Sequence, residues 1–231
     1  MLEKLKKDVC DANISLEKYG LVVLTWGNVS GIDRKKGLVV IKPSGVEYKR
    51  MKPADMVVVN FNGDVMEGKK HPSSDTPTHL ELYRAFPEIG GITHTHSTYA
   101  TIFAQAGLEI PCLGTTHADQ FFGSVPVTRL LSEREVESDY EKNTGRLIVD
   151  RLKDTDVRNT PGILAAGHGA FCWGDNASQS VENSLILERI AEMAFRTMQL
   201  NPEIKQLPAY IVKKHYMRKH GENAYYGQKH K

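Results

Sequence analysis

The segment at residues 90–96, Gly-Gly-Ile-Thr-His-Thr-His, constrains the fold most, because it places two histidines two residues apart at the end of a β-type run. Successive side chains of a strand point to opposite faces, so residues i and i+2 project together. His94 and His96 can therefore converge on one point, as a metal site with two imidazole ligands requires. The alternative interpretation is a pair of ordinary polar residues near a sheet end.

Composition narrows the class of protein. The chain has 231 residues, of which 40% are hydrophobic and 25% charged, and this suits a single large α/β domain. A net charge of +2 gives no general electrostatic reason to expect nucleic-acid or membrane binding. The N-terminus lacks the apolar block of a secretory signal, and no apolar stretch approaches the roughly 20 residues that span a bilayer. Three widely spaced cysteines predict reduced thiols, so we expect a cytoplasmic protein.

Hydrophobic periodicity and capping signals predict helices over residues 2 to about 20, 76–86, 98–106, 132–153, 177–200 and 208–220. Ser132 and Glu135 have the spacing of a capping box. Residues 38–42 and 56–60 are β-rich, residues 62–64 form a hairpin signal, and the glycine-interrupted apolar run 163–173 is strand-like. The pattern predicts one α/β domain over residues 1–231 with a mixed sheet.

A third imidazole comes from His168, which lies between two glycines in an apolar run. This setting suits a position where backbone and imidazole both approach a ligand closely, although a hydrogen-bonded core histidine is the simpler interpretation of His168 alone. Three imidazoles with one open position suit zinc or a similar divalent ion acting as a Lewis acid. Asp75 could add an oxygen ligand or a nearby base.

Two further segments predict an anion pocket. Lys42-Pro43-Ser44-Gly45 follows a strand, and residues 71–77, with Ser73 and Ser74, precede a helix. Hydroxyls and free backbone N–H groups at a helix N-terminus bind anions, and a lysine adds charge. Each segment alone also suits an ordinary turn or cap, and Asn28 beside Gly27 equally suits a left-handed turn. The basic segment 213–220 is better interpreted as a solvated helix than as a nucleic-acid patch.

Taken together, these motifs resemble the class II aldolase/epimerase family. The segments that carry the resemblance are residues 41–45, 72–79, 94–97, 115–119, 167–169 and 224–228. The resemblance covers essentially the whole chain and is strongest to the pentose-phosphate epimerases of the family. It implies a largely antiparallel sheet flanked by helices, and a C-terminal tail that reaches a neighbouring subunit.

The resemblance also implies roles for individual residues. It implies a divalent metal, usually zinc, with manganese or cobalt also accepted, held by Asp75, His94, His96 and His168. It implies substrate and phosphate contacts from Gly27, Asn28, Lys42, Ser44, Gly45, Ser73 and Ser74. It assigns acid–base chemistry to Asp119 and Tyr226, supplied by a neighbouring subunit of a cyclic homotetramer. For such a role the tyrosine needs help from the metal or from a nearby cation, for which His215 and Arg218 are the candidates. Without the resemblance, a turn-capping aspartate and a packing tyrosine would be preferred for Asp119 and Tyr226.

The implied function is a sugar-phosphate epimerase that cleaves a carbon–carbon bond by a retro-aldol step and re-forms it with inverted configuration. A class II aldolase acting on fuculose or rhamnulose 1-phosphate is the nearest alternative. Such aldolases commonly carry glutamate where Asp75 stands, which favours the epimerase. An adducin-like interaction module is a distant alternative, because it has no reason to keep three converging histidines.

Overall fold

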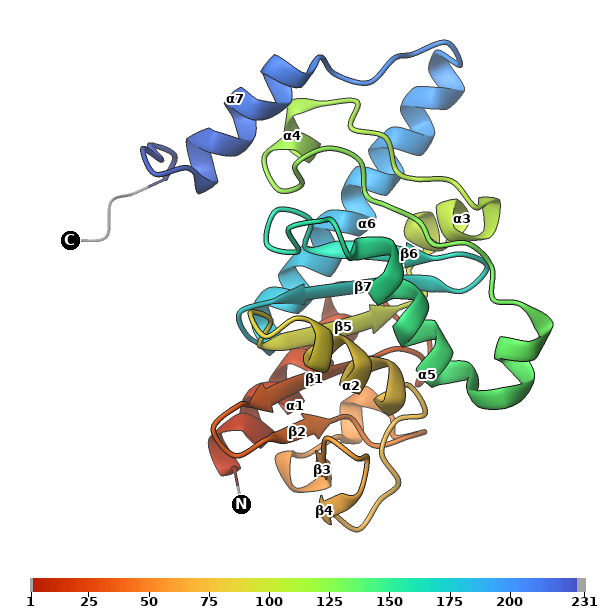
Figure 1. The fold of residues 1–231 in the computed structure, drawn as a ribbon. Helices are drawn as coiled ribbons and strands as arrows, with labels where there is room; N and C mark the ends of the chain where they lie inside the picture. Colours follow the sequence, from red (N-terminus) through yellow and green to blue (C-terminus); the bar gives the residue numbers. More distant parts are fainter. Residues whose placement is uncertain (1, 228–231) are drawn as a thin grey trace.

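One β-sheet organises the fold of the chain (Figure 1). The computed structural model describes residues 2–227, so residues 1 and 228–231 of the expected domain lie outside the described part. The strands of the sheet, in the order β4-β3-β2-β1-β5-β7-β6, are β1 (Asn28–Asp33), β2 (Leu38–Ile41), β3 (Val57–Asn60), β4 (Val65–Glu67), β5 (Gly91–Thr95), β6 (Gly162–Ala165) and β7 (Gly169–Gly174). The helices are α1 (Glu3–Lys18), α2 (Thr76–Ala85), α3 (Thr98–Ala106), α4 (Thr115–Ala118), α5 (Glu133–Leu152), α6 (Ala177–Leu200) and α7 (Ala209–His220). Two short 3₁₀ helices, Tyr48–Arg50 and Pro53–Asp55, precede β3.

The strand pairings confirm an α/β domain with a largely antiparallel sheet. Each neighbouring pair of the described strands is antiparallel, and an isolated parallel bridge joins Val127 to Leu164. The predicted hairpin at residues 62–64 is confirmed as the β3–β4 connection, where Gly63 has φ +90°. β5 lies between β1 and β7, and its register places His94 opposite both Asn28 and Phe171.

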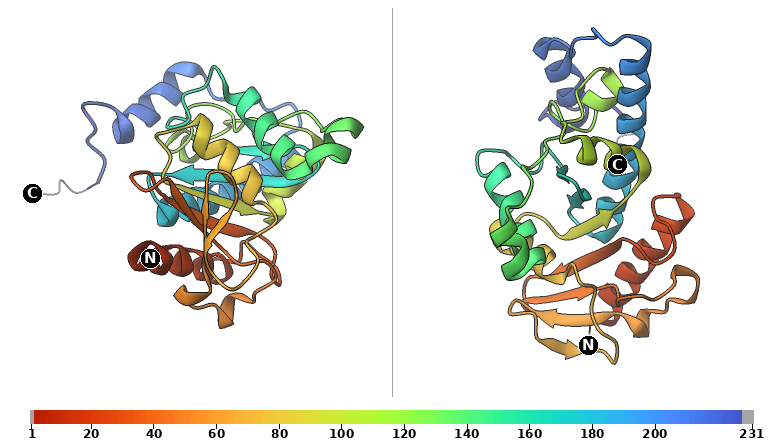
Figure 2. Two further views of the ribbon diagram at one scale, coloured as in Figure 1. Left: turned by 60° about the horizontal axis from the view of Figure 1, so that its bottom comes forward. Right: turned by 90° about the vertical axis from the view of Figure 1, so that its right-hand side faces the viewer.

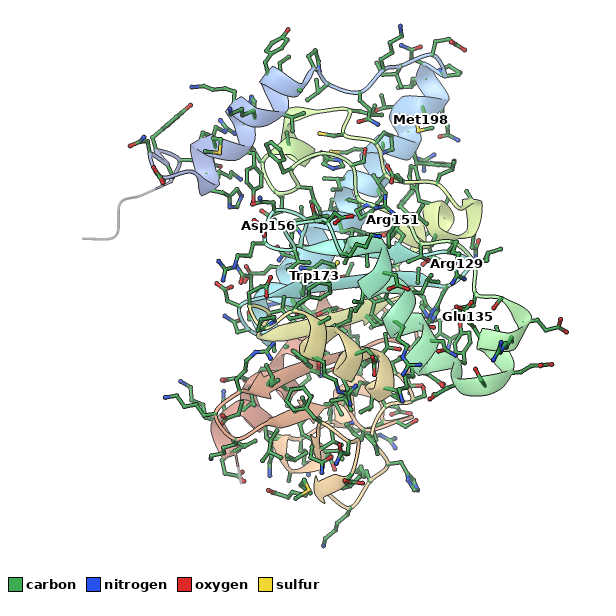
Figure 3. The ribbon with its side chains drawn as sticks, viewed as in Figure 1. Arg129, Glu135, Arg151, Asp156, Trp173 and Met198 are labelled. Atoms are coloured by element: carbon green, nitrogen blue, oxygen red, sulfur yellow. The ribbon has the colours of Figure 1, made fainter. Side chains whose placement is uncertain are left out.

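Helices cover both faces of the sheet (Figure 2), and alternate side chains of each strand reach different layers. Val39 and Ile41 belong to the core beneath α2 and α5, whereas Leu38 and Val40 belong to the core beneath α1. A third cluster joins α3 and α6 to the opposite side of β6 and β7. Trp173, labelled in Figure 3, is buried in the first of these cores, and its indole N–H donates to the Val157 carbonyl at 2.7 Å.

Across residues 2–227, none of the helices combines the length and apolar character needed to cross a bilayer.

The strand-like run at residues 163–173 forms two strands, a division that the apolar pattern does not itself predict. β6 and β7 pair as an antiparallel hairpin around residues 166–168, where Gly167 has φ +70°. That left-handed conformation is one that glycine adopts without a steric cost. The reversal places His168 in the connection at the end of the sheet.

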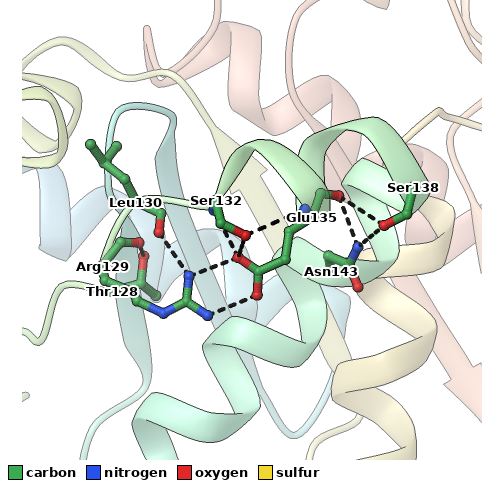
Figure 4. A network of polar contacts seen from close by, with 7 residues as sticks. All are labelled: Thr128, Arg129, Leu130, Ser132, Glu135, Ser138 and Asn143. Atoms are coloured by element: carbon green, nitrogen blue, oxygen red, sulfur yellow. Dashed lines mark hydrogen bonds and ion pairs between the residues drawn. The ribbon is translucent and has the colours of Figure 1, made fainter.

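A polar network begins α5 (Figure 4). Ser132 accepts from the Glu135 N–H, and the Glu135 carboxylate accepts from the Ser132 N–H, which confirms the predicted capping box. Both terminal nitrogens of Arg129 donate to the same carboxylate at 2.8 Å. One turn later Asp139 leaves helical geometry, and the Asn143 amide donates across the break to Glu135 O at 2.8 Å and to Ser138 Oγ at 3.0 Å.

Replacing Ser132 with alanine removes the side-chain cap and should lower the free energy of unfolding by about 1 kcal/mol. Urea unfolding followed by far-UV circular dichroism measures the change. Ser15→Ala is the matched control, because Ser15 lies inside α1 and its hydroxyl donates to Asp11 O rather than capping a helix. Equal loss in both variants would contradict a capping role for Ser132.

Candidate active site

Three histidines converge at one end of the sheet. His94 lies in β5, His96 directly follows that strand, and His168 lies in the β6–β7 connection. One ligand nitrogen from each lies within 4.8 Å of the other two, and the Nε2 atoms of His94 and His96 are 3.0 Å apart. A tetrahedral ion with Zn–N distances of about 2.0–2.1 Å separates its ligand nitrogens by roughly 3.3 Å, so the donor set fits such an ion.

The surroundings orient these imidazoles. The Nδ1 atom of His94 donates to Ala170 O at 3.0 Å, which leaves Nε2 as the free lone pair, and the Phe171 ring stacks on His94 with centroids 4.2 Å apart. Burial, together with the neighbouring His94 and His96, lowers the pKa of His168 to about 4. Its Nδ1 atom is buried and has no hydrogen-bond partner among the described residues, as expected where a ligand is to be bound.

Two glycines allow this close approach. A Cβ on Gly169 would lie 2.6 Å from Thr95 O and 2.8 Å from His96 Cδ2. A Cβ on Gly27, which has φ +76°, would lie 2.8 Å from the His94 carbonyl oxygen. Gly27 therefore shapes the cavity wall through its backbone.

Asp75 enters the same region as the residue that precedes α2. Its Oδ2 atom accepts from Asn28 Nδ2 at 2.6 Å, and the same amide donates to Ser73 Oγ at 3.0 Å. Burial opposes ionisation of Asp75, but His94, His79 and the Asn28 hydrogen bond together lower the pKa of its carboxyl. Asn28 Oδ1 stays buried without a described partner and is an acceptor open to a ligand.

The two predicted anion-binding segments lie side by side. Ser44 N donates to His71 O at 2.9 Å, and Ser73 N donates to Lys42 O at 2.9 Å. Lys42 is 2% exposed, and its ammonium donates to Thr25 O at 3.0 Å. Burial lowers the pKa of Lys42 to about 8 while Asp75 opposes that shift, so the side chain remains a cation at pH 7.

A cavity of about 380 Å³ collects these groups. It is lined by all the residues predicted to bind substrate or metal: Gly27, Asn28, Lys42, Ser44, Gly45, Ser73, Ser74, Asp75, His94, His96 and His168. Thr25, Trp26, Tyr140 and Glu141 also line it and were not predicted from the sequence. Trp26 directly precedes the predicted Gly27, whereas Tyr140 and Glu141 lie beside the Asp139 break in α5, for which the sequence carries no signal. A larger groove, about 710 Å³, lies beside α1 and contains none of the predicted residues.

Helices α4 and α7 lie beyond the β6 edge of the sheet (Figure 1), and Asp119 and Tyr226 form a separate cluster with α7. Arg218 donates to both Asp119 oxygens, at 3.0 and 2.6 Å, and His215 Nδ1 lies 3.1 Å from Oδ1. Burial raises the pKa of Asp119, but the Arg218 and His215 hydrogen bonds outweigh it and lower the pKa. The Arg218 guanidinium also lies 5.0 Å from the Tyr226 ring centroid. The four residues are thus neighbours of one another, and none of them lines the histidine cavity of the same chain.

The sequence of residues 7–195 matches the class II aldolase and adducin N-terminal domain, so the chain belongs to this family. Members that are class II aldolases depend on a divalent metal, and the three-histidine cluster is present here.

Solved structures agree with this assignment. An L-fuculose 1-phosphate aldolase is 26% identical, with a TM-score of 0.79 and coverage of 93% of this chain and 95% of that one. YgbL from Klebsiella pneumoniae, for which aldolase, epimerase and decarboxylase are the candidate activities, is 25% identical, with a TM-score of 0.74 and coverage of 93% and 99%. An L-fuculose-1-phosphate aldolase from Thermus thermophilus, 22% identical with a TM-score of 0.69 and coverage of 88% and 100%, supports the fold alone.

Replacing Gly169 with alanine should displace the His96 ring and weaken zinc binding at least about 10-fold, the scale seen when a metal ligand loses its support. Competition with a chromophoric chelator measures the affinity. Gly114→Ala is the matched control, because a Cβ there meets nothing within 4 Å. Zinc affinity unchanged by Gly169→Ala would show that the His96 position tolerates the contact.

Proposed function

We propose that this protein is a metal-dependent epimerase that interconverts L-ribulose 5-phosphate and D-xylulose 5-phosphate. The observation that carries the proposal is the convergence of three imidazole nitrogens within 4.8 Å in a cavity that also holds Lys42 and two hydroxyl-bearing loops. Metal-binding nitrogens beside an anion pocket suit a sugar phosphate that carries a carbonyl group.

The substrate itself restricts the route. The C4 hydrogen of a 2-ketopentose is not adjacent to the C2 carbonyl, so its removal would give a carbanion with no enolate to stabilise it. The C4 hydroxyl lies β to that carbonyl, so a base at this hydroxyl breaks C3–C4. The products are the enediolate of dihydroxyacetone and glycolaldehyde phosphate. Rotation of the aldehyde and re-addition then invert C4.

In this proposal each part of the cavity has a task. His94, His96, His168 and Asp75 would hold the divalent ion, which when bound supplies Lewis-acid stabilisation of the negative charge developing on oxygen. Lys42, the Ser44–Gly45 turn and the Ser73–Ser74 turn retain the phosphate, so the aldehyde fragment stays bound while its face changes. Asn28 orients Asp75 through one amide N–H and offers its open Oδ1 atom to a substrate hydroxyl.

Proton transfer at the C4 oxygen needs one group on each face of the aldehyde. Asp119 and Tyr226 are the proposed pair, and they would reach the cavity of a neighbouring subunit in a homotetramer, since they lie outside the cavity of their own chain. Arg218 and His215 orient Asp119 and keep it ionised. Arg218 contacts both Asp119 and the ring of Tyr226.

A sugar-phosphate aldolase is the second candidate, favoured by the 26% identity to an L-fuculose 1-phosphate aldolase. Asp75, which accepts from Asn28 at 2.6 Å, lies outside the described three-histidine cluster, and in this proposal its short carboxylate, in place of the glutamate common in such aldolases, would complete the coordination of a bound ion rather than carry a proton at C3. This difference supports the epimerase over the aldolase. The converging histidines likewise argue against an adducin-like module without catalysis.

Incubation of the zinc-loaded protein with L-ribulose 5-phosphate should yield D-xylulose 5-phosphate, detected by a coupled assay. A chelator should abolish turnover, and added zinc should restore it, because an ion held by the histidines would supply the Lewis-acid stabilisation of negative charge that the route needs. Accumulation of free glycolaldehyde phosphate without the epimer would establish the aldolase instead. Full turnover by metal-free protein would refute metal dependence.

If each active site is built from residues of two neighbouring subunits, two inactive variants should complement each other when they assemble together. His168→Ala disables the cavity, and Asp119→Asn disables the proposed acid–base cluster. When the two are co-refolded, random assembly of a cyclic tetramer pairs an intact cavity with an intact cluster at about one quarter of the interfaces. We expect about that fraction of wild-type activity. The control mixture of His168→Ala with His96→Ala should stay inactive, and inactivity of both mixtures would place the site within one chain.

A further inference from the structure

β5 presents two different rows of side chains. His94 lies on the cavity side, whereas Thr93 and Thr95 face α6. Thr93 Oγ1 lies 2.7 Å from Ser180 Oγ, and Thr95 Oγ1 lies 3.5 Å from Ser184 Oγ. One face of α6 therefore holds the back of the strand that carries the histidines.

Glu188 continues this face of α6, four residues after Ser184 and eight after Ser180. It is 6% exposed, and its two carboxylate oxygens accept from the N–H groups of Tyr99 and Ala100, each at 2.9 Å. These N–H groups lie in the first turn of α3, where no carbonyl group of the helix itself can accept their hydrogen bonds. Ser97, at the start of the helix, makes no side-chain capping bond. A carboxylate on a helix N-terminus is also favoured by the helix dipole.

The position of His96 depends on this contact more than the positions of the other histidines do. His94 is paired with Phe171 and Asn28 in the sheet, but the β5–β7 ladder ends at Thr95, one residue before His96. The exposed His96 is followed after one residue by α3, whose first turn Glu188 holds. The backbone of His96 is thus fixed by the strand on one side and by the Glu188 cap on the other.

We propose that Glu188 is a positioning residue for the histidine cluster: by capping α3 from α6, it fixes His96 at the metal-binding distance from His94. The inference rests on the proposed function only insofar as the cluster binds a metal. Glu188 touches neither the histidines nor the cavity, and it acts through the backbone between them.

Glu188→Gln tests the proposal in the full-length protein. The amide has one oxygen, so one of the two N–H donors loses its acceptor and the capping charge is lost. We expect Zn²⁺ affinity, measured by competition with a chromophoric chelator, to fall about 10- to 100-fold. The visible absorption of the Co²⁺ derivative should also change, since it reports the coordination geometry.

A merely structural role would lower stability without moving these readouts. Ile190→Val is the matched control, because Ile190 is a buried residue of the same helix that takes no part in the cap. It should lower the urea midpoint while leaving Zn²⁺ affinity and the Co²⁺ spectrum unchanged. Wild-type affinity and spectrum in folded Glu188→Gln would overturn the positioning role and leave the proposed function standing. Failure of the wild-type chain to bind either ion would overturn both.

Discussion

The placement of β5 between β1 and β7 is the constraint on which the candidate site depends. Hydrogen-bonded neighbours on both sides fix its register, so Asn28 and Phe171 necessarily flank His94. A slip of one residue would turn the threonines into the cavity and both histidines toward α6. Because α6 offers Ser180 and Ser184 to the threonines, the polar contacts behind the strand and the histidines in front of it select the same register.

The cavity keeps polar groups whose hydrogen-bonding capacity the protein leaves unused. Asn28 Oδ1 and His168 Nδ1 are buried without partners among the described residues, and each such group costs about 1–3 kcal/mol of folding free energy. Both belong to residues that line the cavity, where a ligand can restore the missing contacts. Lys42 adds a buried cation whose pKa is lowered by burial, and in the proposed function it would offer an incoming phosphate a partner that is already desolvated. Under the proposed function, these positions give up folding stability in favour of ligand binding.

Predictions from the sequence succeeded where neighbouring residues decide the structure. Strand alternation alone predicts that His94 and His96 converge, and the Ser132–Glu135 spacing alone predicts the cap of α5. The β6–β7 turn was missed because an apolar run with glycines has the composition of one buried strand. Tyr140 and Glu141 were missed because they reach the cavity only through the Asp139 break, which Asn143 stabilises by contacts across the helix. Such tertiary arrangements leave no periodic signal.

The cluster around Asp119 bears on the choice between epimerase and aldolase. Asp119 is held by Arg218 and His215, and these hydrogen bonds lower the pKa of its carboxyl, so at neutral pH it accepts a proton rather than donating one. The phenolic O–H of Tyr226 is a proton donor. An aldolase that acts on one stereoisomer needs a single such group at the aldehyde oxygen, whereas an epimerase must remove the proton on one face and return it on the other. A proton acceptor and a proton donor that both contact Arg218 would meet the second requirement, which is why the proposed function gives both residues a part.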